Sequence, residues 1–316
     1  MKSGSVKKII FAIILLTLVA GMAAAQSAAR NAAQASNQAA APATAQPEAK
    51  PAAQDSAVSV TEPTQAAHKA PQPKTQAEYD SFQAATTLTD AAKLEAAATE
   101  FAQRFPESEL RGYLFQQAMG QYQAAGDGDK SLEMARAVLK YEPNNAVALL
   151  TAAQMLSERT HDFDLDHNER LSEAEADARN ALRHASDVTP PAGMTATQFA
   201  EVMAQLRGTA HEVLGTVSFK RADYFNAIKE YNAAINEERE RTDAVVYLRL
   251  AVSHDKSDDA QSALHAADKA IALSQPGSQI RQLAEREKDR LLKLATPDIQ
   301  EQIDRRTKLP VNVIPH

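Results

Sequence analysis

The chain has 316 residues, of which 44% are apolar and 5% aromatic, no cysteine, and a formal net charge of −7 at pH 7. The absence of cysteine excludes disulfides, zinc sites built on thiolates, a cysteine nucleophile and a lipid-modified N-terminal cysteine. The acidic balance, with a pI of about 5.7, argues against nucleic acid as the main partner, because phosphate binding requires a basic face.

The first 25 residues have the layout of a secretory signal peptide. A lysine-containing head is followed by an apolar run at residues 9–20 and an A-x-A motif at residues 23–25. The run is shorter than the about 20 residues that a membrane-spanning helix needs. We therefore predict that residues 1–25 are removed and that the protein is periplasmic, attached to the cell envelope or secreted. The alternative is an uncleaved inner-membrane anchor formed by residues 9–25.

Residues 26–74 are rich in alanine, glutamine and proline and contain almost no large aliphatic side chain. Such a segment cannot bury enough apolar surface to offset the entropy lost on ordering. It predicts a disordered linker between the signal segment and the folded part.

From residue 75 onward, apolar residues recur at helical spacing, and the abundance of alanine favours helices over strands. The helices are expected in pairs, each pair forming one unit. The units are residues 75–106, 112–145, 146–186, 195–241 and 244–277. A capping helix at 278–295 and a polar tail at 296–316 complete the chain.

The fourth unit begins with an unusually long helix. Thr195 and Gln198 form a capping-box pattern at its start, and the apolar stripe continues to about Lys220. The helix therefore has two or three turns ahead of the repeat itself.

A repeated interval supports the division into units. Met119 and Ser131 are twelve residues apart, as are Gly215 and Ala227. Residues 208–241, with Leu214 before Gly215, resemble the tetratricopeptide repeat, a 34-residue helix–turn–helix unit. The whole of residues 75–295 is similar to exported bacterial proteins of this family. The resemblance implies an all-α, right-handed solenoid of helix hairpins.

The resemblance also implies a concave groove lined by the first helix of each unit. Groove positions carried over from the family select a mixed polar set that includes two aromatic residues. These residues are Tyr113, Gln116, Gln123, Gln154, Glu158, Glu212, Phe219, Lys220, Asp255 and Lys256.

An insertion in the third unit, residues 160–170, contains a metal-ligand spacing. Asp162, Asp164, Asp166 and Glu173 fall at positions 1, 3, 5 and 12 of an EF-hand calcium loop. His167 stands where that loop needs glycine for its sharp turn, so the alternative is an acidic, solvated loop.

The sequence contains no G-x-S-x-G, P-loop, G-x-G-x-x-G or H-E-x-x-H motif. We therefore predict a non-enzymatic scaffold without a cofactor, which binds a protein or peptide partner and no nucleic acid. Contact with a membrane is expected only if the N-terminal segment is uncleaved. The alternatives are a calcium-regulated module, an envelope enzyme accessory or carbohydrate-handling factor, and a role in self-assembly.

Overall fold

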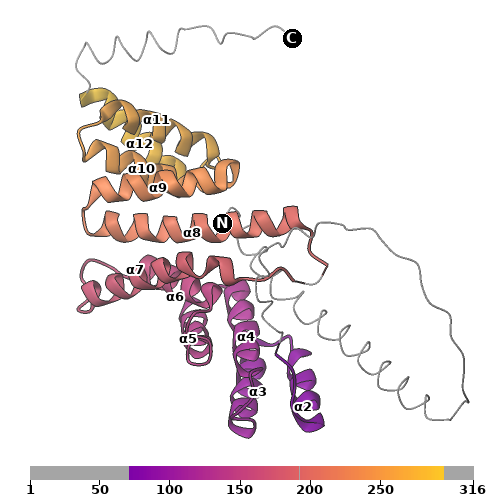
Figure 1. Cartoon of the computed structure of the whole chain (residues 1–316). Helices are drawn as coiled ribbons and strands as arrows, with labels where there is room; N and C mark the ends of the chain where they lie inside the picture. Colours follow the sequence, from indigo (N-terminus) through magenta and orange to yellow (C-terminus); the bar gives the residue numbers. More distant parts are fainter. Residues whose placement is uncertain (1–70, 192, 295–316) are drawn as a thin grey trace, which may run out of the picture.

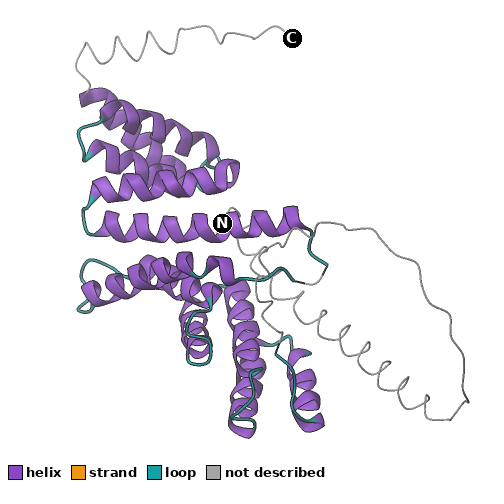
Figure 2. Ribbon diagram, in the orientation of Figure 1, coloured by secondary structure: helices purple, strands orange, loops and turns teal. Residues whose placement is uncertain are grey.

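The computed structural model describes residues 71–191 and 193–294, and all regular structure in these residues is helical (Figure 2). The predicted signal peptide, most of the predicted linker and the predicted tail lie outside this range. The α-helices are α2 (Gln76–Thr86), α3 (Ala91–Arg104), α4 (Arg111–Ala125), α5 (Gly128–Leu139), α6 (Ala146–Arg159), α7 (His167–Arg183), α8 (Ala196–Lys220), α9 (Tyr224–Glu238), α10 (Ala244–Asp255), α11 (Ala260–Leu273) and α12 (Gln279–Leu294).

The helices pair as hairpins in chain order. α2 packs on α3, α4 on α5, α6 on α7, α8 on α9 and α10 on α11, and each hairpin packs on the next. α12 packs on α10 and α11 at the C-terminal end of the stack. In Figure 1, α3 and α4 run down the page whereas α8 and α9 run across it, so the stack rotates along its length. The predicted all-α solenoid of hairpins is confirmed.

Aspartates start many of the helices. The side chains of Asp90, Asp127, Asp223 and Asp259 each accept a hydrogen bond from the backbone N–H three residues later, at 2.9 to 3.2 Å. Each bond satisfies a donor that has no partner inside its helix, and such a cap contributes about 1 kcal/mol. These short acidic caps specify where the helices begin.

The turns of three hairpins have the same backbone conformation. Gly126, Ala222 and Asp258 all adopt the left-handed conformation, with φ of 79°, 57° and 60°. The N–H of the following aspartate donates to the carbonyl five residues earlier in each case, at 2.9 to 3.0 Å. This is the Schellman arrangement that terminates a helix, and here it places the N-cap of the next helix immediately afterwards.

The hairpins stack through small residues. Ala98, Ala118, Ala135, Ala152 and Ala178 are fully buried between neighbouring helices. One continuous apolar core extends from Phe82 on α2 to Val217 on α8, and a second joins α9, α10 and α11 around Tyr231. The alanine-rich composition therefore produces close helix packing, because small side chains let the backbones approach.

The long helix forms as predicted, and its start is secured by the expected capping box. Thr195 Oγ1 accepts from the Gln198 N–H at 3.2 Å, and Gln198 Oε1 accepts from the Thr195 N–H at 3.0 Å. Among the described helices, including this one of 25 residues, none combines the length and apolarity needed to cross a membrane.

The helix after the insertion starts earlier than predicted. The sequence indicated a start near Leu171, but α7 begins at His167, so the loop covers only residues 160–166. Arg170 lies within 3.9 Å of Asp164 and Asp166, which gives these carboxylates a cation on the first turn of the helix.

Candidate functional site

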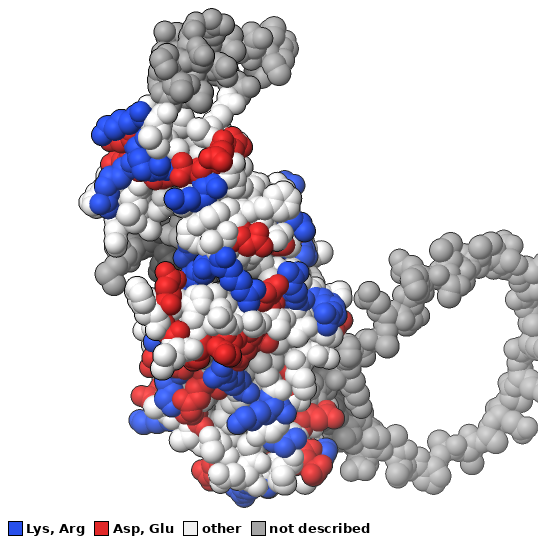
Figure 3. Space-filling model, turned by 90° about the vertical axis from the view of Figure 1, so that its left-hand side faces the viewer, with Lys and Arg blue, Asp and Glu red and all other residues white. Residues whose placement is uncertain are grey.

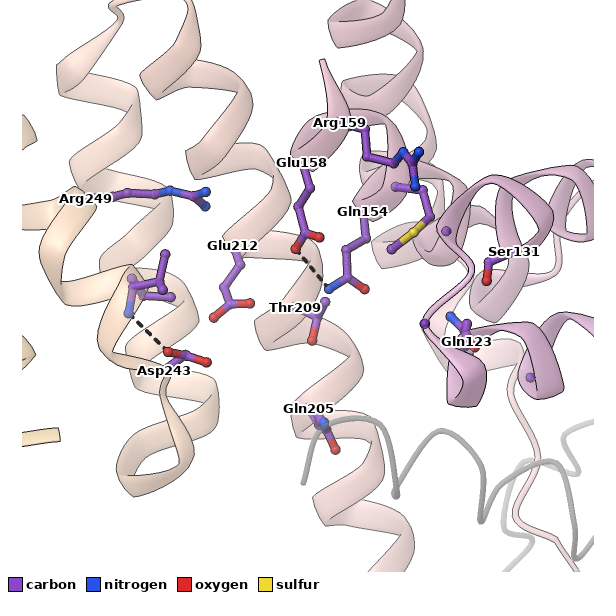
Figure 4. Close-up of a pocket in the computed structure, with 16 residues that line it drawn as sticks. Gln123, Ser131, Gln154, Glu158, Arg159, Gln205, Thr209, Glu212, Asp243 and Arg249 are labelled. Atoms are coloured by element: carbon purple, nitrogen blue, oxygen red, sulfur yellow. Dashed lines mark hydrogen bonds between the residues drawn. The ribbon is translucent and has the colours of Figure 1, made fainter. Parts of the chain in front are cut away.

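The first helices of four successive hairpins border a groove of about 610 Å³ (Figure 4). α4, α6, α8 and α10 supply most of its lining, and the start of α5 closes one end. The lining residues are Gly120, Gln123, Gly126, Gly128, Ser131, Gln154, Met155, Glu158, Arg159, Gln205, Thr209, Glu212, Asp243, Val245, Val246 and Arg249. The groove thus runs across the repeats, and no single repeat contains it.

Three helices each contribute one amide side chain to the groove: Gln123 from α4, Gln154 from α6 and Gln205 from α8. Gln123 donates to Thr151 Oγ1 at 3.1 Å, but its own Oε1 is buried without a partner. Gln154 makes only a long hydrogen bond, 3.4 Å, to Glu158. Amides have both donors and acceptors, so this row can bond to the peptide groups of another chain.

Gln205 is the most unusual of the three amides. Its side chain is 5% exposed, and it makes no hydrogen bond with any described residue. The polar ends of this amide are not fully buried and open into the groove, so they are available to a ligand that enters it. Gln205 lies in the part of α8 that precedes the repeat itself, so the extension of α8 contributes this residue to the groove lining.

Charges of both signs lie along the groove. Arg249 donates to Thr216 Oγ1 at 2.8 Å, and Arg159 pairs with Asp129 at 2.7 Å. Asp243 caps α10 by accepting from the Val245 N–H at 3.1 Å. The carboxylates of Glu158 and Glu212 complete a lining that has hydrogen-bonding, apolar and charged surfaces but no histidine.

Four of the ten residues predicted for the groove line it: Gln123, Gln154, Glu158 and Glu212. The other six lie in the described structure but outside this lining, and five of them have contacts within the fold. Gln116 accepts from Asn145 at 3.1 Å, and Asp255 pairs with Arg290 of α12 at 2.6 Å. Lys256 follows α10 and is exposed.

The remaining three residues make contacts within a hairpin or between neighbouring hairpins. Tyr113 packs against the larger core, and burial raises its pKa to about 12. Phe219 packs edge-on against Tyr224, with ring centroids 6.0 Å apart. Lys220 donates to the carbonyl oxygen of Thr160 at 2.5 Å, and burial lowers its pKa. At the end of α8, Phe219 and Lys220 therefore contact the neighbouring turns instead of lining the groove.

Sequence reasoning missed Gln205, Thr209, Asp243 and Arg249. Gln205 precedes the 34-residue unit, so counting positions within the unit could not select it. The available signal was the capping box at Thr195, which marks a helix long enough to extend past its neighbours.

The structure does not gather the four predicted calcium ligands. Glu173 lies within α7 and makes two hydrogen bonds with Arg136, at 2.7 and 2.9 Å. Asp164 accepts from the His161 N–H at 2.8 Å, and this bond holds the pKa of its carboxyl below the usual value. Asp162 is largely exposed, and Asp166 directly precedes α7. Within residues 71–191 and 193–294, no three histidine or carboxylate side chains form a metal-binding group, so the calcium prediction rests on sequence spacing alone.

The fold and the groove together define a helical-hairpin solenoid with a polypeptide-sized groove on the side of its first helices. No family model matches the sequence, and no curated protein sequence matches it. Among solved structures, the chain is similar to the MamA protein, at 18% identity and a TM-score of 0.37 over 65% of this chain and 98% of that one.

Two further structures have the same kind of similarity. The thermophilic TPR protein TTC0263 of Thermus thermophilus matches at 13% identity and a TM-score of 0.36, over 66% of this chain and 98% of that one. A tetratricopeptide repeat protein from Parabacteroides merdae matches at 12% identity and a TM-score of 0.34, over 73% of this chain and 98% of that one.

Proposed function

We propose that the protein is a non-enzymatic scaffold that binds an extended polypeptide segment in the groove between α4 and α10. The observation that carries the proposal is Gln205, an amide that is almost buried, faces the groove and lacks a partner among the described residues. A peptide backbone offers the donor and the acceptor that this side chain needs.

The spacing of the amides favours an extended partner. Gln154 and Gln205 come from α6 and α8, which pack on each other, and packed helices lie about 8–10 Å apart in general. Gln123 lies on the first helix of the preceding hairpin. An extended chain rises about 3.3 Å per residue, so every third peptide group can reach the next amide. A helical partner hides its backbone groups and cannot use such a row.

We place this scaffold in the periplasm or the cell envelope. That part of the proposal rests on the layout of residues 1–25 in the sequence, which includes an apolar run and a cleavage motif.

The proposal is tested with peptides from a random dodecapeptide library, selected on the full chain without residues 1–25. Peptides recovered by the wild type are labelled, and their dissociation constants are measured by fluorescence anisotropy. Gln205→Leu is expected to weaken binding about tenfold, because hydrogen bonds to the peptide are lost. The same change should leave the free energy of unfolding unaltered, because Gln205 makes no hydrogen bond with the described residues that could be lost.

A loss of affinity at unchanged stability separates a binding role from damage to the fold. Gln103→Leu is the matched control, because Gln103 is exposed on α3 and does not line the groove. Equal affinities for wild type and Gln205→Leu, or a library that yields no groove-dependent peptide, would refute the proposal.

A further inference from the structure

The loop between α6 and α7 presents two large apolar side chains to solvent. Phe163 is 97% exposed and Leu165 is 106% exposed, which are the highest values among the exposed large hydrophobic residues of the described chain. Single exposed apolar residues are common on proteins, but two at alternate positions of one short loop form a patch. We call residues 162–166 the DFDLD loop.

Hydrogen bonds hold the N-terminal part of the loop in place. Thr160 is fully buried, and its carbonyl oxygen accepts from Lys220 Nζ of α8 at 2.5 Å. Asp164 closes a turn by accepting from the His161 N–H at 2.8 Å, while its own N–H donates to the His161 carbonyl at 3.0 Å. Phe163 and Leu165 thus project from an anchored turn, which reduces the entropy lost when they are captured.

Carboxylates surround the two apolar side chains. Asp162 and Asp166 have side chains that are 81% and 62% exposed, and Asp164 lies between the apolar pair. The hydrogen bond from the His161 N–H lowers the pKa of Asp164, so this carboxyl stays charged at neutral pH. Arg170 lies within 3.9 Å of Asp164 and Asp166, but three carboxylates against one arginine leave the loop acidic. A partner surface that combines an apolar pocket with positive charge at its border is therefore complementary to it.

We infer that the DFDLD loop is a second interaction site, which inserts Phe163 and Leu165 into an apolar pocket bordered by lysine or arginine on a partner protein. Charge complementarity selects this occupant. An anionic lipid surface would repel the three aspartates. The groove of a second copy sets the carboxylates of Glu158, Glu212 and Asp243 against Arg159 and Arg249, so it complements an acidic loop less well than a purely basic border does. The site differs from the groove, although it begins directly after α6.

The loop lies on the edge where the hairpins turn. Arg221, in the turn after α8, pairs with Glu175 of α7 at 2.5 Å and bonds to Ser172 at 2.9 Å, so the two turns are neighbours. Figure 3 faces this edge and shows lysine, arginine, aspartate and glutamate side chains mixed over it, with uncharged surface between them. Phe225, at the start of α9 and 78% exposed, provides a control position outside the loop.

The test places photo-reactive benzoylphenylalanine at position 163 or, as the control, at position 225 of the full chain in the cells that produce it. After irradiation, the adducts are mapped to residues by mass spectrometry. The expected result is an adduct specific to position 163, formed with apolar residues of a partner that have lysine or arginine as neighbours.

Two variants test the loop's own contribution. Leu165→Ser should reduce the adduct about tenfold, because one apolar anchor is lost, and Asp162→Asn with Asp166→Asn should reduce it severalfold at low salt. All three positions are exposed, so circular dichroism should show unchanged unfolding. An adduct no stronger than at position 225, one formed with lipid, a second copy or an acidic surface, or one insensitive to both variants would overturn the inference. Gln205→Leu serves as a groove control and should leave the adduct unchanged.

Discussion

The hairpins α4–α5 and α8–α9 have the same backbone conformation at their turns but differ in the side chains that pack between their helices. Each first helix begins its repeat with Arg-Gly, at Gly112 and Gly208, and each second helix is followed or ended by a glutamate whose side chain reaches that glycine. When the turns are aligned, Gly126 matches Ala222 and the capping aspartates coincide. The same turn thus forms on sequences that agree at only a few positions.

The two hairpins exchange large and small residues across one contact. In α4–α5, the aligned positions hold Met119 and Ala135, both fully buried. In α8–α9, they hold Gly215 and Tyr231, and a methyl group added to Gly215 would lie 2.6 Å from the Tyr231 ring. The space between the two helices is filled in both hairpins, by the first helix in α4–α5 and by the second helix in α8–α9. This exchange explains why the repeat pattern in the sequence is weak although the fold repeats.

The largest expected effect comes from emptying this contact. Tyr231→Ala removes a fully buried ring beside a glycine that cannot fill the space, so the free energy of unfolding should fall by about 3–5 kcal/mol. Urea denaturation followed by circular dichroism measures this loss.

The matched experiment converts one hairpin into the other. Gly215→Met alone overpacks the contact and should cost about 1–3 kcal/mol or more. Combined with Tyr231→Ala, it reproduces the Met119–Ala135 arrangement and should recover part of the loss. If the double variant lost as much free energy of unfolding as the two single variants together, the large and small residues would not be interchangeable between the two helices.

The sequence predicted the hairpins well, because their signals are local. The capping box of Thr195 and Gln198 and the twelve-residue interval each depend on residues within one unit. The groove was predicted only in part, because it depends on how successive hairpins rotate. Lys220 was expected in the groove, but it bonds to Thr160 on the preceding hairpin.

Replacing the glycine that begins each unit should change the free energy of unfolding less, and by different amounts in the two hairpins. A methyl group at Gly208 would collide with Cγ of Glu238, close to the backbone, whereas at Gly112 it meets first the carboxylate end of Glu142, which can move. Gly208→Ala should therefore lower the free energy of unfolding by about 1–2 kcal/mol, even after the gain in helix propensity. Gly112→Ala should change it by less than about 0.5 kcal/mol, since propensity and crowding offset each other. Paired urea titrations measure both values, and equal costs at the two sites would contradict this difference.

The smallest effect concerns the turn. Ala222 adopts φ of 57°, where its Cβ is strained, while Gly126 meets the same demand without strain. Ala222→Gly should raise the free energy of unfolding by about 0.5–1 kcal/mol, and Gly126→Ala should lower it by about 1 kcal/mol. Asp258→Gly is the informative control, because aspartate tolerates φ of 60° better than alanine and the gain should be smaller. Thermal unfolding of the three variants ranks them directly. A loss of stability in Ala222→Gly would show that the greater freedom of glycine in the unfolded chain outweighs the relieved strain at this turn.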